Sequence, residues 1–130
     1  MKQTLLRESL RFSIEKMRKL DRRSMPKNCH FSFIVVNNRI LEWGTNRYQS
    51  IPKHWGYDVT FQGLHSEMSA YIRGSGLILN KPFSLINVRF SNFMHLKLSK
   101  PCPDCTRMMT SLGCTECVYT TPNGWVTEKF

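Results

Sequence analysis

The sequence predicts a layered α/β sandwich built as one domain. Two helix-like stretches, 64–73 and 102–112, alternate with strand-like stretches, and helices that alternate with strands pack on the faces of a shared sheet. The length of 130 residues suits a single domain, 1–130, with one modest core. Apolar residues make up 41% and charged residues 22% of the chain, which is an ordinary globular balance and excludes a disordered protein.

The N-terminal segment 1–27 is basic, and its residues 4–20 predict an amphipathic helix that packs on the sheet. Its apolar residues recur at helical spacing: Leu6, Leu10, Ile14, Met17 and Leu20. Nine Lys and Arg residues against three acids give the segment +6 of the chain's +10 net charge. Such a surplus favours anionic partners, namely nucleotides, nucleic acid or a membrane surface, and the alternative is a solvated helix that keeps the protein soluble.

The first strands form a predicted hairpin. Residues 31–36 are rich in β-branched and aromatic side chains, Asn37 and Asn38 predict a turn, and 39–43 return as the second strand. The following stretch, 47–63, has no clear periodicity. A long irregular segment in a compact domain is often functional, so we expect a loop that faces a substrate.

Two helices follow, each with a recognisable start or stop. The first covers 64–73, and the glycines at 74 and 76 predict its end. The second covers 102–112. Pro101 suits its first helical position, and Gly113 suits its end.

The remaining strands are expected at 83–90, 117–121 and 125–130. Asn123-Gly124 is a strong signal for a type I′ turn, so the last two of these strands should pair as an antiparallel hairpin.

Two motifs at the predicted helix starts carry the chemistry. Leu64-His65-Ser66-Glu67 supplies an imidazole and a carboxylate, and Lys100-Pro101-Cys102-Pro103-Asp104-Cys105 supplies two thiols. His65, Cys102 and Cys105 are three candidate zinc ligands, and a site with three protein ligands keeps its fourth position for water, as catalytic zinc does. Glu67 is the candidate general base.

A second Cys-x-x-Cys pair leaves a competing zinc site open. Cys114 and Cys117 follow Cys105 after only eight residues, whereas four-cysteine zinc ribbons separate their pairs by roughly 15–20 residues. Buried core thiols are the alternative for this pair and for Cys29. Five cysteines without a secretion signal favour a reducing compartment and thiols used on metal.

The motifs match H-x-E followed by P-C-x-x-C, and over residues 31–130 the chain resembles the cytidine/deoxycytidylate deaminase superfamily. The resemblance implies a three-layer α/β/α cytidine deaminase-like sandwich with a five-stranded mixed sheet and a C-terminal antiparallel hairpin. It also implies bound Zn²⁺ at His65, Cys102 and Cys105, with Glu67 as the catalytic proton shuttle. Many relatives are homo-oligomers, so the resemblance also implies a second copy of this chain as a possible partner.

The same resemblance implies four substrate-binding residues, Asn46, Ser66, Lys100 and Pro101. Asn46 matches the asparagine that contacts the ribose. Ser66 stands where alanine is usual, and the backbone N–H of that residue contacts the pyrimidine. Lys100, before Pro101, stands where a small or hydroxylic residue is usual; its carbonyl can accept from the amino group of the base, but its charge raises the question of substrate.

The resemblance implies hydrolytic deamination of cytosine to uracil in a cytidine or deoxycytidine nucleoside or nucleotide, such as dCMP. The alternative substrate is cytosine in single-stranded DNA or RNA, which the net charge and a set of basic and aromatic residues favour: Lys53, His54, Trp55, Tyr57, Phe93, Lys97 and Lys100. A third reading is a non-catalytic nucleic-acid-binding module, and Glu67 argues against it because binding alone has no use for that carboxylate.

We expect an intracellular, cytoplasmic protein with no membrane partner. Residues 1–20 lack the continuous apolar core of a signal peptide, and the longest apolar stretch, 31–36, is far too short to span a bilayer.

Overall fold

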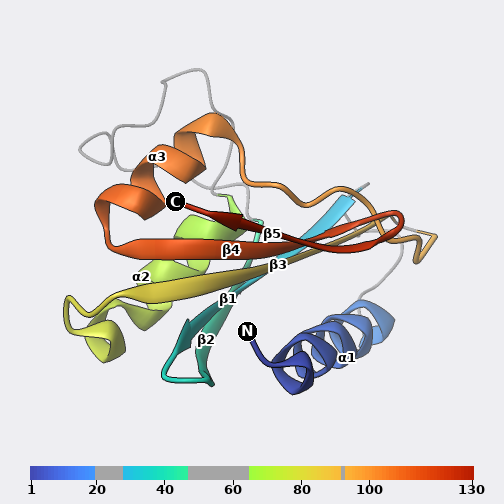
Figure 1. Cartoon of the computed structure of the whole chain (residues 1–130). Coiled ribbons are helices and arrows are strands. Elements are labelled where there is room, and N and C mark those ends of the chain that lie inside the picture. The colour runs from blue at the N-terminus through green and yellow to red at the C-terminus, as the bar shows by residue number, and fades with distance from the viewer. Residues whose placement is uncertain (20–27, 47–64, 92) are drawn as a thin grey trace.

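The computed structural model describes residues 1–19, 28–46, 65–91 and 93–130, and these form one five-stranded sheet with helices on both faces (Figure 1). The predicted loop 47–63 lies outside the described residues. The elements are α1 (Gln3–Lys19), β1 (Asn28–Val36), β2 (Arg39–Thr45), α2 (Ser66–Ile78), β3 (Phe83–Ser91), α3 (Pro103–Ser111), β4 (Cys114–Thr121) and β5 (Gly124–Lys129).

The sheet is mixed, with strand order β2-β1-β3-β4-β5. β1 pairs antiparallel with both β2 and β3, β3 pairs parallel with β4, and β4 pairs antiparallel with β5. The five-stranded mixed sheet and the antiparallel C-terminal hairpin of the sequence analysis are therefore confirmed.

The helices make the outer layers of the predicted sandwich, with α1 on one face of the sheet and α2 and α3 on the other (Figure 1). Alternate residues of β1 serve the two faces, as the strand period requires. Phe31 and Phe33 pack with Leu6 of α1, whereas Ile34 packs with Met68 of α2. Two hydrophobic cores result, one on each side of the sheet.

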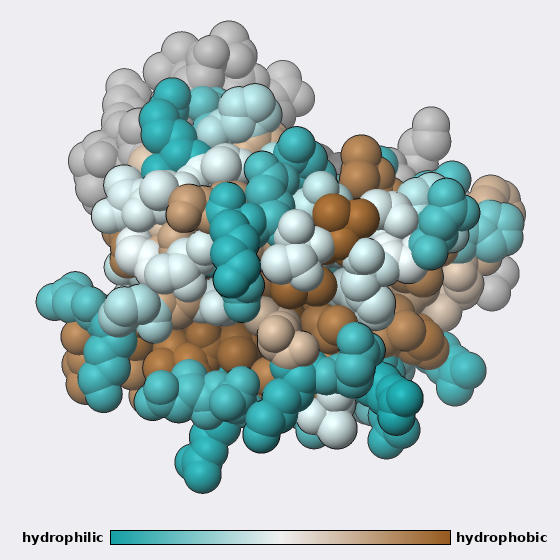
Figure 2. Space-filling model, in the orientation of Figure 1, coloured by the Kyte–Doolittle hydropathy of each residue, from teal (hydrophilic) through white to brown (hydrophobic). Residues whose placement is uncertain are grey.

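Helix α1 confirms the predicted amphipathic helix up to Lys19, and Leu20 lies outside the described residues. Leu6 and Met17 are buried against the sheet, and Leu10 and Ile14 are partly buried beside them. Hydrophilic side chains gather along the lower rim of the molecule, where α1 lies, with hydrophobic residues behind them (Figure 2). The apolar stripe thus serves packing, and the charges stay in water.

The predicted stop of the second helix is wrong, because α2 continues through both glycines to Ile78. A Cβ at Gly74 would lie 3.1 Å from Cβ of Glu42, so the missing side chain lets β2 pack closely on the helix. The helix ends instead at Leu79, which adopts a left-handed conformation with φ of 51°. Tertiary packing here outweighs the low helix propensity of glycine.

The third helix begins one residue later than predicted, and a different proline starts it. Pro103, not Pro101, occupies the first helical position, and Cys102 is the N-cap residue. Its sulfur accepts a hydrogen bond from the backbone N–H of Cys105 at 3.3 Å. A thiol therefore replaces the usual oxygen cap of a helix.

Of the two predicted tight turns, one is confirmed and one is wrong in type. Asn37 and Asn38 have φ of 51° and 60°, as a type I′ turn requires. In the C-terminal hairpin Thr121 pairs with Gly124, so Pro122 and Asn123 are the central residues. Proline fixes φ near −65°, which excludes type I′, and only Gly124 has a positive φ, of 124°.

Gly44 allows β2 to approach α2 at the end of the strand that leads to Asn46. A Cβ at this position would lie 2.3 Å from the backbone nitrogen of Ala70. We expect Gly44→Ala to cost about 1–3 kcal/mol of unfolding free energy, the usual range for overpacking. Gly76→Ala is the matched control. It sits in a helix with no atom within 4 Å of a new Cβ, and it should stabilise the protein by roughly 0.5–1 kcal/mol. Urea unfolding measures both, and equal effects would contradict the close approach.

Candidate metal and catalytic site

The N-terminal ends of α2 and α3 meet at one end of the sheet and bring the two sequence motifs together. His65 is the N-cap residue of α2, Cys102 is the N-cap residue of α3, and Cys105 lies in the first turn of α3. Both helices lead into strands, β3 and β4, that run parallel to each other. Both helix starts therefore lie at the end where β3 and β4 finish.

The three predicted ligands converge on one point. His65 Nδ1 lies 3.2 Å from Cys105 Sγ and 3.5 Å from Cys102 Sγ, and all three ligand atoms lie within 4.8 Å of one another. A nitrogen and a sulfur bound tetrahedrally to one zinc ion, at about 2.0–2.1 Å and 2.3 Å, are roughly 3.6 Å apart. The donor set and its spacing fit Zn²⁺, and three protein ligands leave one tetrahedral position for water.

The electrostatics of the cluster favour ionised sulfur. The hydrogen bond with the Cys105 side chain is the largest cause that lowers the pKa of the Cys102 thiol to about 4, and His65 adds to it. The hydrogen bond with Cys102 in turn raises the pKa of His65. A cation at this point would displace the imidazole proton and take its charge-stabilising role, because metal ligands bind in deprotonated form.

Glu67 lies in the first turn of α2, two residues after His65, and is 5% exposed. Burial raises the pKa of its carboxyl group. Its Oε1 accepts a hydrogen bond of 2.8 Å from Nδ2 of Asn87. Among the described residues, the group of side chains placed to share one ion holds His65, Cys102 and Cys105 and does not include Glu67. The carboxylate is thus beside the cluster without belonging to it, as a general base requires.

The second cysteine pair lies elsewhere. Cys114 begins β4 opposite Phe83, at the end of the sheet away from the cluster, and burial raises the pKa of its thiol to about 12. Cys117 is fully buried, and burial raises its pKa as well. In the parts of the chain that the structure describes, neither thiol belongs to a metal cluster. Buried core thiols are the interpretation that the structure supports, for Cys29 too.

Ser66 is buried, and its side chain points into the fold. Its Oγ lies 2.7 Å from Oγ of Ser32 on β1, so the hydroxyl bonds to the sheet beneath the helix. Its backbone N–H is among the first N–H groups of α2, which have no acceptor within the helix.

Lys100 and Pro101 precede the cluster in the segment between β3 and α3. Pro101 is buried, whereas Lys100 is exposed and its Nζ lies 3.6 Å from Oε2 of Glu128 on β5. The charge that departs from the superfamily pattern is therefore paired with an acidic partner.

Asn46 lies just after β2 and lines a cavity of about 350 Å³. Its Oδ1 accepts a hydrogen bond of 3.2 Å from the backbone N–H of His30. The cavity is lined by Lys16, Lys19, Cys29, His30, Phe31, Trp43, Thr45 and Asn46. Because β1 begins beside the end of β3, this cavity and the metal cluster lie at the same end of the sheet, but Phe31 and Trp43 of its lining belong to the α1 face, opposite the cluster.

His30 is the side chain that links this cavity to the cluster electrostatically. Burial is the main cause that lowers its pKa to about 4, and the charges of Arg89 and His65 lower it further. His30 is therefore neutral at ordinary pH and can donate or accept a hydrogen bond at the cavity wall.

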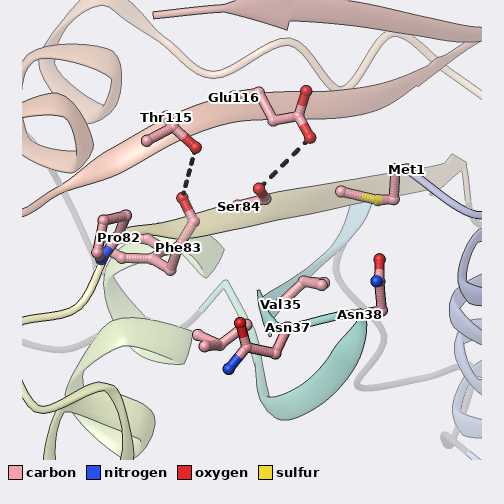
Figure 3. A pocket seen from close by; sticks show the side chains of 10 residues that line it. Met1, Val35, Asn37, Asn38, Pro82, Phe83, Ser84, Thr115 and Glu116 are labelled. Atoms are coloured by element: carbon pink, nitrogen blue, oxygen red, sulfur yellow. Dashed lines mark hydrogen bonds between the residues drawn. The ribbon is translucent and has the colours of Figure 1, made fainter.

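A second cavity, of about 250 Å³, lies at the opposite end of the sheet (Figure 3). The Asn37-Asn38 turn, Met1 and the first residues of β3 and β4 line it. Ser84 Oγ donates to Oε1 of Glu116 at 3.5 Å on one side of this cavity. It contains none of the predicted site residues.

Sequence reasoning missed two polar residues beneath the site, Asn87 and Ser32. Both interrupt apolar runs, Leu85-Ile86-Asn87-Val88 and Phe31-Ser32-Phe33. A polar side chain inside a buried strand needs a hydrogen-bond partner, and this is the signal that could have found them.

Comparisons with known proteins place the fold. No protein-family model matches the sequence, and no curated protein matches it significantly. A dCMP deaminase from the cyanophage S-TIM5, in apo form, matches in structure with a TM-score of 0.57 over 93% of this chain and 86% of that chain, at 19% identity. The same enzyme in complex with dCMP and dUMP gives a TM-score of 0.55 over 92% and 82% of the two chains, also at 19% identity.

A cytidine deaminase from Mycobacterium leprae gives a TM-score of 0.55 over 94% of this chain and 92% of that chain, at 18% identity. This chain has the cytidine deaminase fold. The layered α/β architecture expected from the two motifs is thereby confirmed, and the triad of His65, Cys102 and Cys105 stands at the helix ends of that fold. No helix among the described residues is long and apolar enough to cross a bilayer.

Proposed function

We propose that this protein is a zinc-dependent hydrolytic deaminase that converts cytosine to uracil in a cytidine or deoxycytidine nucleoside or nucleotide, such as dCMP. The observation that carries the proposal is the convergence of His65, Cys102 and Cys105 beside the buried carboxyl group of Glu67. The cytidine deaminase fold adds to it.

The three converging side chains would hold the metal ion. When bound by three protein ligands, zinc lowers the pKa of a water in its remaining position toward neutrality. Glu67 would carry one proton from this water to the ring nitrogen N3, and would then carry the proton of the new C4 hydroxyl to the amino group of cytosine, which leaves as ammonia. The C4–O bond forms, the C4–N bond breaks, and water plus cytosine becomes uracil plus ammonia. The raised pKa of Glu67 makes its carboxylate a stronger base for this transfer.

The substrate contacts follow from the residues around the cluster. The backbone N–H of Ser66 can donate to the pyrimidine, because it has no acceptor within α2. The Ser66 hydroxyl bonds to Ser32 instead and does not enter the site. Asn46 would contact the sugar from the cavity wall. Lys16 and Lys19 line the same cavity, but they come from α1, on the sheet face opposite the cluster, so we assign them no contact with the substrate.

The first test compares substrates on the zinc-loaded protein. We expect ammonia together with dUMP, deoxyuridine or uridine when dCMP, deoxycytidine and cytidine are offered in turn. Turnover of none of the three, by protein that holds one zinc ion per chain, would contradict the proposal. Turnover of the nucleosides alone would contradict dCMP as the substrate.

Cytosine in single-stranded DNA or RNA is the second candidate substrate, and the surface between β3 and α3 favours it. Phe93 is 75% exposed there, and exposed Lys97 and Lys100 follow it toward the cluster. An exposed ring beside cations suits a stacked base and its phosphates. Lys53, His54, Trp55 and Tyr57, which also suggested such a path, lie outside the described residues.

The second candidate makes a prediction about salt. If single-stranded nucleic acid is the substrate, the logarithm of its binding constant should fall linearly with the logarithm of the salt concentration. The slope should be about −0.7 for each phosphate contacted. Phe93→Ala should then weaken binding of an oligonucleotide, by roughly 1–3 kcal/mol, without changing turnover of dCMP. Fluorescence anisotropy with a cytosine-containing strand measures both effects. No binding at low salt would remove this candidate.

A further inference from the structure

We propose that Asn87 is a positioning residue, which holds the Glu67 carboxylate in its working orientation and ties it to the segment that carries the metal ligands. The inference rests on the proposed function, since it assigns a task to a residue beneath the same site. A buried hydrogen-bond network under the first turn of α2 supports this role.

Asn87 lies in the middle of β3 and is 2% exposed. Leu85, two positions before it and on the same face of β3, is fully buried in the core beneath α2 and α3. A primary amide in such surroundings costs free energy unless its polar groups are all paired. The strand therefore needs a compensating reason to carry an amide at this position.

Every hydrogen-bonding group of the Asn87 side chain is used. Nδ2 donates to Oε1 of Glu67 at 2.8 Å and to the backbone O of Ser99 at 3.1 Å, and Oδ1 accepts from the Ser32 hydroxyl at 2.7 Å. The reversed amide would turn its oxygen toward a carboxylate and a carbonyl, which are both acceptors. The partners thus fix a single orientation, with both donors directed to their acceptors.

The bonds form a closed chain under the helix start. Because Ser32 donates its proton to Asn87, the proton between Ser66 and Ser32 must come from Ser66. The chain leaves α2 at Ser66, crosses β1 and β3, and returns to α2 at Glu67. It gives the serine that departs from the superfamily pattern a structural task, since the Ser66 hydroxyl anchors the same turn that carries the general base.

The other donor of Asn87 reaches the segment before α3. Ser99 lies three residues before Cys102, and its hydroxyl donates back to the backbone O of Asn87 at 2.9 Å. Its backbone N–H donates to the O of Thr120 on β4 at 2.9 Å. One side chain on β3 therefore bonds both to the general base and to the segment that precedes the thiols.

Loss of this contact should affect the chemical step more than binding. A misplacement of about 1 Å in a catalytic group costs on the order of 100-fold in rate. We expect Asn87→Ala to lower kcat by roughly 10- to 100-fold and to leave KM within about 3-fold, because the contact orients the base and does not touch the substrate. Zinc content should be unchanged.

Ile86→Val is the matched control for a general loss of stability. It removes a methylene from the neighbouring residue of the same strand, on the opposite face, where no contact reaches Glu67. We expect this variant to lose folding stability and to keep kcat. Equal losses of kcat in the two variants would overturn the positioning role, since both would then act through the fold.

A double-mutant cycle tests whether Asn87 acts through Glu67. If it does, adding Asn87→Ala to Glu67→Gln should lower kcat by less than about 3-fold, because the group it positions is already disabled. A further fall as large as in the single variant would overturn the proposal.

The contact also has a readout that needs neither turnover nor a folded Asn87 variant. In the proton–nitrogen NMR spectrum of the zinc-loaded protein, the Asn87 side-chain amide should give a downfield signal, which Glu67→Gln should move upfield because the acceptor loses its charge. An unmoved signal would overturn the contact. If the wild-type protein deaminates nothing while this shift occurs, the proposed function fails and the positioning of Glu67 stands.

Discussion

Glu67→Gln should lower turnover by several orders of magnitude and leave the metal site loaded. Glutamine keeps the size of the side chain and can still accept from Asn87, but its amide cannot take a proton from water at neutral pH. General acid–base groups typically contribute about 10²–10⁴-fold, so we expect kcat to fall by that factor with one zinc ion per chain retained. Steady-state kinetics and metal analysis of the same preparation measure the two quantities.

The same variant should not be less stable. Burial raises the folded-state pKa of Glu67 above its unfolded value, so the folded protein holds this proton more tightly, and ionisation at neutral pH disfavours folding. Replacement by a neutral amide removes that cost. Glu15→Gln, on the exposed face of α1, is the control and should change neither activity nor stability. Wild-type-like turnover in Glu67→Gln would contradict the assignment of the base.

Cys105→Ser should remove the metal, and activity with it. Cys105 is fully buried at the centre of the cluster, and a serine hydroxyl does not ionise at neutral pH as a thiol near a cation does. Changes outside the ligand shell alone weaken metal affinity by about 10–100-fold, so loss of a ligand should weaken it further. Competition with a zinc chelator measures the affinity of wild type and variant.

Cys117→Ser is the matched control, because it makes the same change at a fully buried thiol on β4, outside the cluster. This variant should keep one zinc ion per chain, whatever its effect on stability. Loss of zinc in both variants to the same degree would favour the four-cysteine site that the sequence left open, and would contradict the cluster of His65, Cys102 and Cys105.

Local patterns in the sequence were sufficient for the order of the strands and helices and for the convergence of His65, Cys102 and Cys105. The spacing of Leu6, Leu10, Ile14 and Met17 predicted α1, because a buried helix face imposes its period on the sequence. The two motifs predicted the cluster because each stands at the start of a helix that precedes one of two parallel strands. The N-terminal ends of both helices therefore lie at the same end of the sheet.

The two errors come from side-chain contacts that local propensity does not describe, one between distant residues and one within the first turn of α3. Gly74 looked like a helix stop, but its small size serves the contact with Glu42 on another strand. Pro101 looked like the first helical residue, yet the following Cys102 caps the helix through its sulfur, and Pro103 takes that place. Propensity alone cannot weigh such tertiary contacts against local preference.

The network of Asn87 was missed because its members are far apart in the sequence. Ser32, Ser66, Asn87 and Ser99 come from four different segments, and no local pattern joins them. Each is a buried polar residue. The sheet register places Ser32 opposite Asn87, and the hydrogen bonds of the folded chain bring Ser66 and Ser99 to them. An unexplained amide in an apolar strand is the signal to look for in other sequences of this fold.

The central claim is that water replaces the amino group of cytosine at this site, and deamination of dCMP in heavy-oxygen water tests it most directly. We expect the zinc-loaded protein to form dUMP that carries the heavy oxygen at C4, with one ammonia released per dUMP, and we expect Glu67→Gln to form it about 10²–10⁴-fold more slowly. Absence of dUMP with the folded, zinc-loaded protein, or formation of dUMP at the same rate in Glu67→Gln, would contradict the account.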